Sequence, residues 1–126
     1  MGLPQVNTTA RFLWGVAICL TVIGSLSPGN STLMRAVSSL HVSDKTLHFS
    51  GYALLAILPI LGMRRKASAL WAAGSMVLLG LLLELAQNFV PGRSPEVADE
   101  VANALGVACG IVIAFPFRRP EKESAG

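Results

Sequence analysis

Four long apolar stretches, bounded by charged residues, constrain this chain more than any other feature. They cover residues 12–26, 46–63, 67–90 and 101–117. A helix of about 18 residues, rising about 1.5 Å per residue, is roughly 27 Å long, close to the ~30 Å hydrocarbon core of a membrane. Each stretch is therefore long enough to cross a bilayer as a helix.

The composition excludes an ordinary soluble protein. Of the 126 residues, 52% are hydrophobic and 13% are charged, whereas a soluble domain carries about 25% charged residues. No stretch alternates with the period of two that barrel strands require. Cys19 and Cys109 both lie inside apolar stretches, so they indicate neither a disulfide framework nor a zinc site. We predict an all-α fold, an integral membrane bundle of four transmembrane helices in one domain spanning residues 1–126.

The basic residues predict the orientation of these helices. One set of loops and ends carries seven of them: Arg11, Arg64, Arg65, Lys66, Arg118, Arg119 and Lys122. The other set carries three: Arg35, Lys45 and Arg93. Since cytoplasmic loops are enriched in Lys and Arg, both termini are predicted to be cytoplasmic, in a multi-pass protein of the cytoplasmic (inner) membrane. The isoelectric point near 9.3 then reflects topology, and no nucleic-acid partner is expected.

The first span also has features of a signal peptide. Its end, Ser25-Leu26-Ser27, has the small-x-small pattern of a cleavage site. We expect the span to be retained, and its removal would not alter the predicted orientation of the other three.

Polar side chains gather at one end of three predicted spans, on the extracytoplasmic side. Ionisable residues within a span cost about 2.5–3.5 kcal/mol each, which makes them functional candidates. We predict one ligand-binding site formed by Asp44, Lys45, His48, Tyr52, Glu84, Gln87, Arg93, Asp99 and Asn103. The spacing of Asp44, His48 and Tyr52 places them on one helix face. A carboxyl as deep as Glu84 must be protonated, paired or hydrated, and its available partners are Arg93, His48 and Lys45.

Several of these residues also have simple structural explanations. His48 fits a buried histidine bonded to a carbonyl, Tyr52 fits an interface anchor, and Asp99 fits a favourable charge at a helix N-terminus. Small residues on the fourth span predict a stripe for helix packing rather than a ligand site: Ala98, Ala102, Gly106 and Gly110.

Three motifs in order resemble the VanZ-like family of small membrane proteins. They are Asp44-Lys-x-x-His-Phe-x-x-Tyr52, Glu84-x-x-Gln87-x-x-x-Pro-Gly-Arg93-Ser, and Asp99-x-x-x-Asn-x-x-Gly106-x-x-x-Gly110. The resemblance covers residues 44–115, with a departure at residues 95–98, where relatives often carry an aromatic-rich stretch. It implies a membrane protein of the cell envelope. One member of the family is associated with resistance to glycopeptide antibiotics, especially teicoplanin, most relatives are membrane proteins of unknown activity, and the resemblance implies no reaction.

The residues support three alternative functions. In the first, Arg93, Lys45 and His48 bind an anionic head group, such as a lipid-linked phosphate or cell-wall precursor. In the second, the protein is an enzyme acting on a lipid head group. Its catalytic candidates are His48 as base or nucleophile, Glu84 as acid and Asp99 or Asp44 as the orienting group. The third is a proton-coupled lipid transporter.

No cofactor and no metal site is predicted. A single histidine lies at the depth of the site, and oxygen-rich metal sites usually show more carboxylates per helix. Membrane lipids are the expected partners, and the oligomeric state is not predicted.

Overall fold

The computed structural model describes the backbone of residues 3–118 and the side chains of residues 8–118. The fold contains four long helices: α1 (Leu3–Leu26), α3 (Asp44–Gly62), α4 (Lys66–Gln87) and α5 (Val97–Ala114). A short helix, α2 (Thr32–Ser38), lies between α1 and α3, and a 3-10 turn, η1 (Phe115–Phe117), follows α5. No strand occurs within residues 3–118. Two of the basic residues used for the orientation, Arg119 and Lys122, lie outside the described residues.

The long helices agree with the four predicted spans. Segments Thr8–Leu26, Asp44–Gly62, Lys66–Gln87 and Val97–Phe117 are each long and apolar enough to cross a membrane. The prediction of an all-α chain with four candidate transmembrane helices is therefore confirmed. Helix α5 begins at Val97, four residues before the apolar stretch, and Asp99 and Glu100 lie in its first turn, where carboxylates are favoured by the helix dipole.

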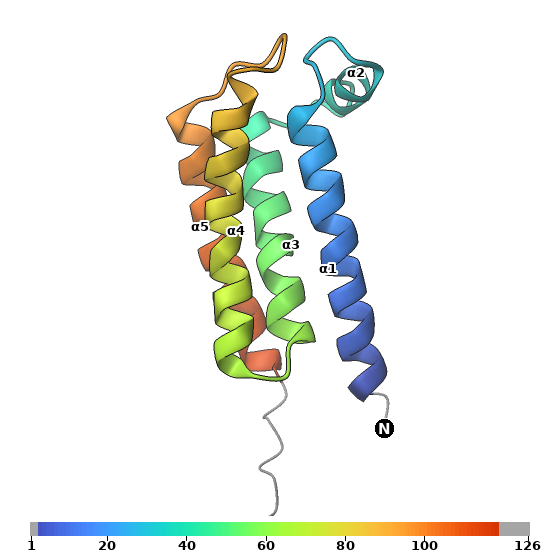
Figure 1. Ribbon diagram of the computed structural model, residues 1–126, viewed down its shortest axis with the longest axis vertical. Helices are drawn as coiled ribbons and strands as arrows, with labels where there is room; N and C mark the ends of the chain where they lie inside the picture. The colour runs from blue at the N-terminus through green and yellow to red at the C-terminus, as the bar shows by residue number, and fades with distance from the viewer. Residues whose placement is uncertain (1–2, 119–126) are drawn as a thin grey trace, which may run out of the picture.

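The short helix α2 was not predicted. The Ser31 side chain caps it, accepting a hydrogen bond from the Met34 backbone N–H at 3.2 Å. Seven residues with no buried side chain give too weak a periodic pattern for prediction from sequence. The helix lies at one end of the bundle, beside the end of α1 (Figure 1).

Helices α3, α4 and α5 pack together, and α1 lies alongside α3 (Figure 1). Long helices that follow one another in the sequence run in opposite directions, so α3 and α5 are parallel, and the start of α1 and the end of α5 lie at the same end of the bundle (Figure 1). The apolar core lies between α3, α4 and α5, where Leu55, Ile60, Ala73 and Val107 are buried.

The most extensive helix contact joins α3 and α5. A Cβ atom at Gly106 would meet the Phe49 carbonyl oxygen, and one at Gly110 would meet the Ala53 carbonyl oxygen. These two glycines therefore let the helix backbones approach closely. In the predicted stripe Ala102 is only half-buried and Ala98 is exposed.

Candidate functional site

The polar side chains from three helices meet at the end of the bundle where α2 lies. Helix α3 begins here because the Ser43 side chain accepts a hydrogen bond from the Thr46 backbone N–H at 3.1 Å. This cap places Asp44 and Lys45 in the first turn of α3, opposite the first turn of α5. The start of α3 and the start of α5 thus form two walls of the candidate site.

Lys45 joins these two walls. Its Nζ donates to Asp99 Oδ1 at 2.5 Å and to Glu96 Oε2 at 3.0 Å, and lies 4.0 Å from Asp44 Oδ2. The Asp99 side chain is only 6% exposed. A buried carboxylate needs a partner to offset its lost hydration, and Lys45 supplies it.

His48 is held in one orientation by α5. Its Nδ1 lies 2.7 Å from Asn103 Oδ1, and Asn103 Nδ2 donates to Glu100 Oε2 at 3.2 Å. Because the amide nitrogen faces a carboxylate, the amide oxygen must face His48, and Nδ1 therefore carries the proton. In the neutral imidazole the lone pair is then on Nε2, which lies 3.7 Å from Asp44 Oδ1.

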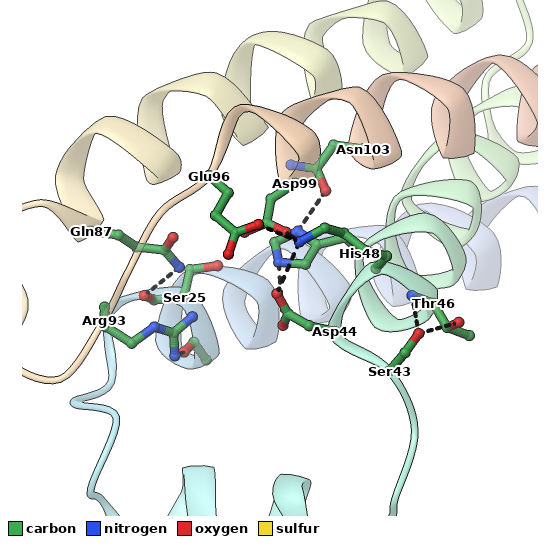
Figure 2. A network of polar contacts seen from close by, with 12 residues as sticks. Ser25, Ser43, Asp44, Thr46, His48, Gln87, Arg93, Glu96, Asp99 and Asn103 are labelled. Carbon is green, nitrogen blue, oxygen red and sulfur yellow. Dashed lines mark hydrogen bonds and ion pairs between the residues drawn. The ribbon is translucent and has the colours of Figure 1, made fainter.

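Arg93 and Gln87 both contact the end of α1. Arg93 Nη1 donates to the carbonyls of Gly24 and Ser27 at 3.3 and 3.4 Å, and lies 2.8 Å from Met34 Sδ. Gln87 Nε2 donates to the Ser25 carbonyl at 3.0 Å (Figure 2). These carbonyls are the acceptors that a helix leaves open at its C-terminus. The two side chains therefore fix α1 against the α4–α5 loop.

Glu84 and Tyr52 lie deeper in the bundle. Glu84 is 7% exposed, and its Oε2 has no hydrogen-bond partner among residues 8–118. The structure does not join it to Arg93, which turns toward α1 instead. Tyr52 is buried in the apolar core, against Gly80 of α4, where a Cβ atom would lie 3.1 Å from its ring.

A cavity of about 320 Å³ opens between α2, the starts of α3 and α5, and the end of α4. Five of the nine predicted site residues line it: Asp44, His48, Gln87, Arg93 and Asp99. Lys45 and Asn103 contact this lining from outside, and neither Glu84 nor Tyr52 is part of it. Sequence reasoning missed the α2 residues in the wall, Met34, Val37 and Ser38. The Ser31 cap before them is the only local signal of their helix.

Comparison with known protein families gives a match that covers nearly the whole described chain. A family model, VanZ/LLP1, matches residues 8–118, which includes α1 and extends beyond the region in which the motifs were found. No curated protein and no solved structure matched the chain. The chain therefore belongs to the VanZ/LLP1 family of VanZ-like multi-pass membrane proteins.

Proposed function

We propose that this protein binds the phosphate-bearing head group of a lipid in the cavity beside α2. The observation that carries the proposal is the position of Arg93 in the cavity wall, beside Gln87. Only Nη1 of Arg93 has hydrogen-bond partners among residues 8–118. The remaining N–H groups of its planar guanidinium are left to bind phosphate oxygens, an arrangement to which arginine is suited.

The cavity lining favours an amphiphilic ligand over a free anion. Besides the polar side chains, the lining includes the apolar residues Met34, Val37, Val42 and Leu47. Ligand sites combine apolar walls with a few polar groups and enclose about 300–1,000 Å³. A volume of about 320 Å³ therefore suits a head group with its first chain atoms rather than a whole lipid.

The basic residues support an extracytoplasmic position for this cavity. The opposite end of the bundle carries five of the described basic residues: Arg11, Arg64, Arg65, Lys66 and Arg118. The cavity end carries three: Arg35, Lys45 and Arg93. An excess of Lys and Arg is typical of the cytoplasmic side of a membrane protein, so these counts favour a cytoplasmic position for the end opposite the cavity. A lipid-linked cell-wall precursor at the outer face has the required chemistry. Because one member of the family is associated with teicoplanin resistance, antibiotic susceptibility is a cellular readout for this proposal.

Native mass spectrometry of the purified full chain tests the proposal. The probes are a polyprenyl phosphate, phosphatidic acid, phosphatidylcholine and, as a free phosphate monoester, glycerol 3-phosphate. Arg93→Gln is expected to weaken binding of the two anionic lipids about tenfold, which corresponds to about 1.4 kcal/mol. Arg35→Gln removes the same charge from α2 at a residue outside the cavity lining, so its binding should equal that of the wild type.

Three outcomes would contradict the proposal or part of it. Equal binding of phosphatidylcholine and the anionic lipids would exclude phosphate recognition. Equal weakening by Arg35→Gln would show that only the general charge of the surface matters. Glycerol 3-phosphate that binds as tightly as the lipids would keep the phosphate site but exclude a lipid ligand.

A second candidate function, a reaction on the same head group, is favoured by the orientation of His48. Asn103 holds Nδ1 as the donor, so Nε2 is the nitrogen available to accept a proton as a general base. In this case the purified protein should convert a polyprenyl-phosphate-linked substrate, and His48→Gln should abolish the conversion. Saturable binding without product would favour binding alone.

A further inference from the structure

Three potential metal ligands converge in the cavity wall. Asp44 and His48 lie one helical turn apart on α3, and Asp99 faces them from α5. Each offers one ligand atom, and these atoms all lie within 4.8 Å of one another. The sequence alone predicts no metal site, because a single histidine lies at this depth and each helix carries few carboxylates. Only the close contact of α3 with α5 brings Asp99 beside the other two.

The hydrogen bond from His48 Nδ1 leaves the Nε2 lone pair available to bind a metal ion. Histidine ligands usually donate their second ring N–H to an acceptor, which fixes the tautomer and the ring plane. Asn103 Oδ1 is that acceptor at 2.7 Å, and Glu100 fixes the direction of the Asn103 amide. The Nε2 lone pair is therefore presented on the side of Asp44, where its distance to Oδ1 is 3.7 Å.

All three groups present acceptor atoms, which can ligate a cation. Ligand atoms of a tetrahedral zinc site lie about 3.3 Å apart, as follows from metal–ligand bonds of about 2.0–2.2 Å. The 3.7 Å between His48 Nε2 and Asp44 Oδ1 is close to this value. Lys45 neutralises Asp99 through Oδ1, so a metal ion would compete with its ammonium group or use the second oxygen of Asp99.

The charge of the cavity wall supports the same conclusion. Asp44 and Asp99 line it together with a single arginine, Arg93. Lys45 is paired with Asp99, and the exposed Asp44 carboxylate would still repel the anionic head group of the proposed function. A divalent cation bound to the two carboxylates would reverse that local charge, and three protein ligands leave an open coordination position for a phosphate oxygen.

We propose that Asp44, His48 and Asp99 bind one divalent transition-metal ion, with Zn²⁺ as the best match to one imidazole nitrogen and two carboxylate oxygens. The role of the ion as a ligand for a head group rests on the proposed function. The binding of the ion itself does not.

Isothermal titration calorimetry with ZnCl₂ tests this site. The purified full chain is stripped of metal with a chelator, kept in detergent and studied without added lipid. One zinc ion per chain is expected. His48→Gln and Asp44→Asn should each lower the zinc affinity about 100-fold or more, beyond the effect usual for residues that only orient a ligand. The Asp44 side chain is 65% exposed, so Asp44→Asn should leave folding intact.

Two further variants serve as controls. Glu96→Gln removes a charge that also contacts Lys45 but no ligand atom, so its zinc affinity should equal that of the wild type. Lys45→Gln removes the competing ammonium group, so its affinity should rise. The melting temperature of each variant, measured without metal, separates loss of binding from loss of folding.

Several results would overturn the inference: no saturable zinc binding, wild-type binding in His48→Gln, or an equal loss in Glu96→Gln. Titrations with MgCl₂ and CaCl₂ should show much weaker binding, and equal affinity would overturn a site that uses the imidazole nitrogen. Anionic lipids that bind in the presence of chelator, to a chain that does not bind zinc, would refute this inference and leave the proposed function standing. Zinc binding without head-group binding would refute the proposed function and leave this inference standing.

Discussion

Replacing Gly106 with alanine should destabilise this protein, although alanine favours helices more than glycine does. The added Cβ atom would meet the Phe49 carbonyl oxygen and would lie 3.1 Å from the Ala53 backbone nitrogen. Both atoms belong to the backbone of α3, so neither can rotate away as a side chain would. Helices α3 and α5 must therefore move apart along their most extensive contact.

The size of the effect follows from two opposing terms. Overpacking a well-packed site costs about 1–3 kcal/mol, and a contact with backbone atoms belongs at the upper end of this range. Alanine recovers about 1 kcal/mol of helix propensity. The free energy of unfolding should therefore fall by about 2 kcal/mol. Gly74→Ala on α4 is the matched control, because its Cβ atom would have no neighbour within 4 Å.

Reversible unfolding in mixed micelles, followed by circular dichroism, measures both variants. Gly106→Ala should unfold at a lower denaturant fraction than the wild type, whereas Gly74→Ala should unfold at the same fraction or a higher one. Equal stability of Gly106→Ala and the wild type would refute the close approach of the two helices. An equal loss in both variants would show that the effect is a general response to alanine.

Three further predictions concern other parts of the molecule. Arg118→Gln should lower the free energy of unfolding by about 1–2 kcal/mol in the same assay, because Arg118 donates to three carbonyls at the end of α3 and in the following loop; wild-type stability would contradict this. In ¹⁵N NMR spectra, His48 should be protonated on Nδ1, and Asn103→Leu should abolish this preference; a wild-type Nε2–H signal would exclude the proposed orientation. On intact cells, an impermeant thiol reagent should label a single cysteine at Ser94 and not one at Ser68, and the reverse pattern would invert the topology.

The long helices could be predicted because charged residues mark their ends in the sequence. The Arg64-Arg65-Lys66 run separates α3 from α4, and Pro91-Gly92 follows α4. The polar start of α5 could also be predicted, because a carboxylate such as Asp99 is favoured in a first helical turn. The partner of Asp99 could not be predicted, because only the packing of α5 against α3 brings Lys45 beside it.

The residues that gather at this end of the bundle could be predicted from the sequence, but the partners that their side chains contact could not. The spacing of Asp44 and His48 gave their shared face correctly, because both lie on one helix and both line the cavity. The partner of Glu84 could not be deduced, since depth alone does not specify how each helix is rotated about its axis. Arg93 lies in a loop next to the end of α1, where open carbonyls accept its hydrogen bonds. These acceptors are nearer than a carboxyl that lies two turns below the loop.

One face of α5 carries both the glycines that pack against α3 and the polar residues of the candidate site. The buried positions of α5 are Asp99, Asn103, Gly106, Val107, Gly110 and Ala114, which follow one another at helical spacing along the side that faces α3. The glycines set the distance between the two backbones, and this distance lets the short Asn103 side chain reach His48. It also lets Asp99 reach Lys45 one turn further along. A change that separates the helices at Gly106 should therefore release His48 as well. Gly106→Ala is thus expected to weaken the Nδ1 preference of His48 even though it removes no polar atom, and an unchanged tautomer in a destabilised Gly106→Ala chain would show that the polar site is held independently of the packing.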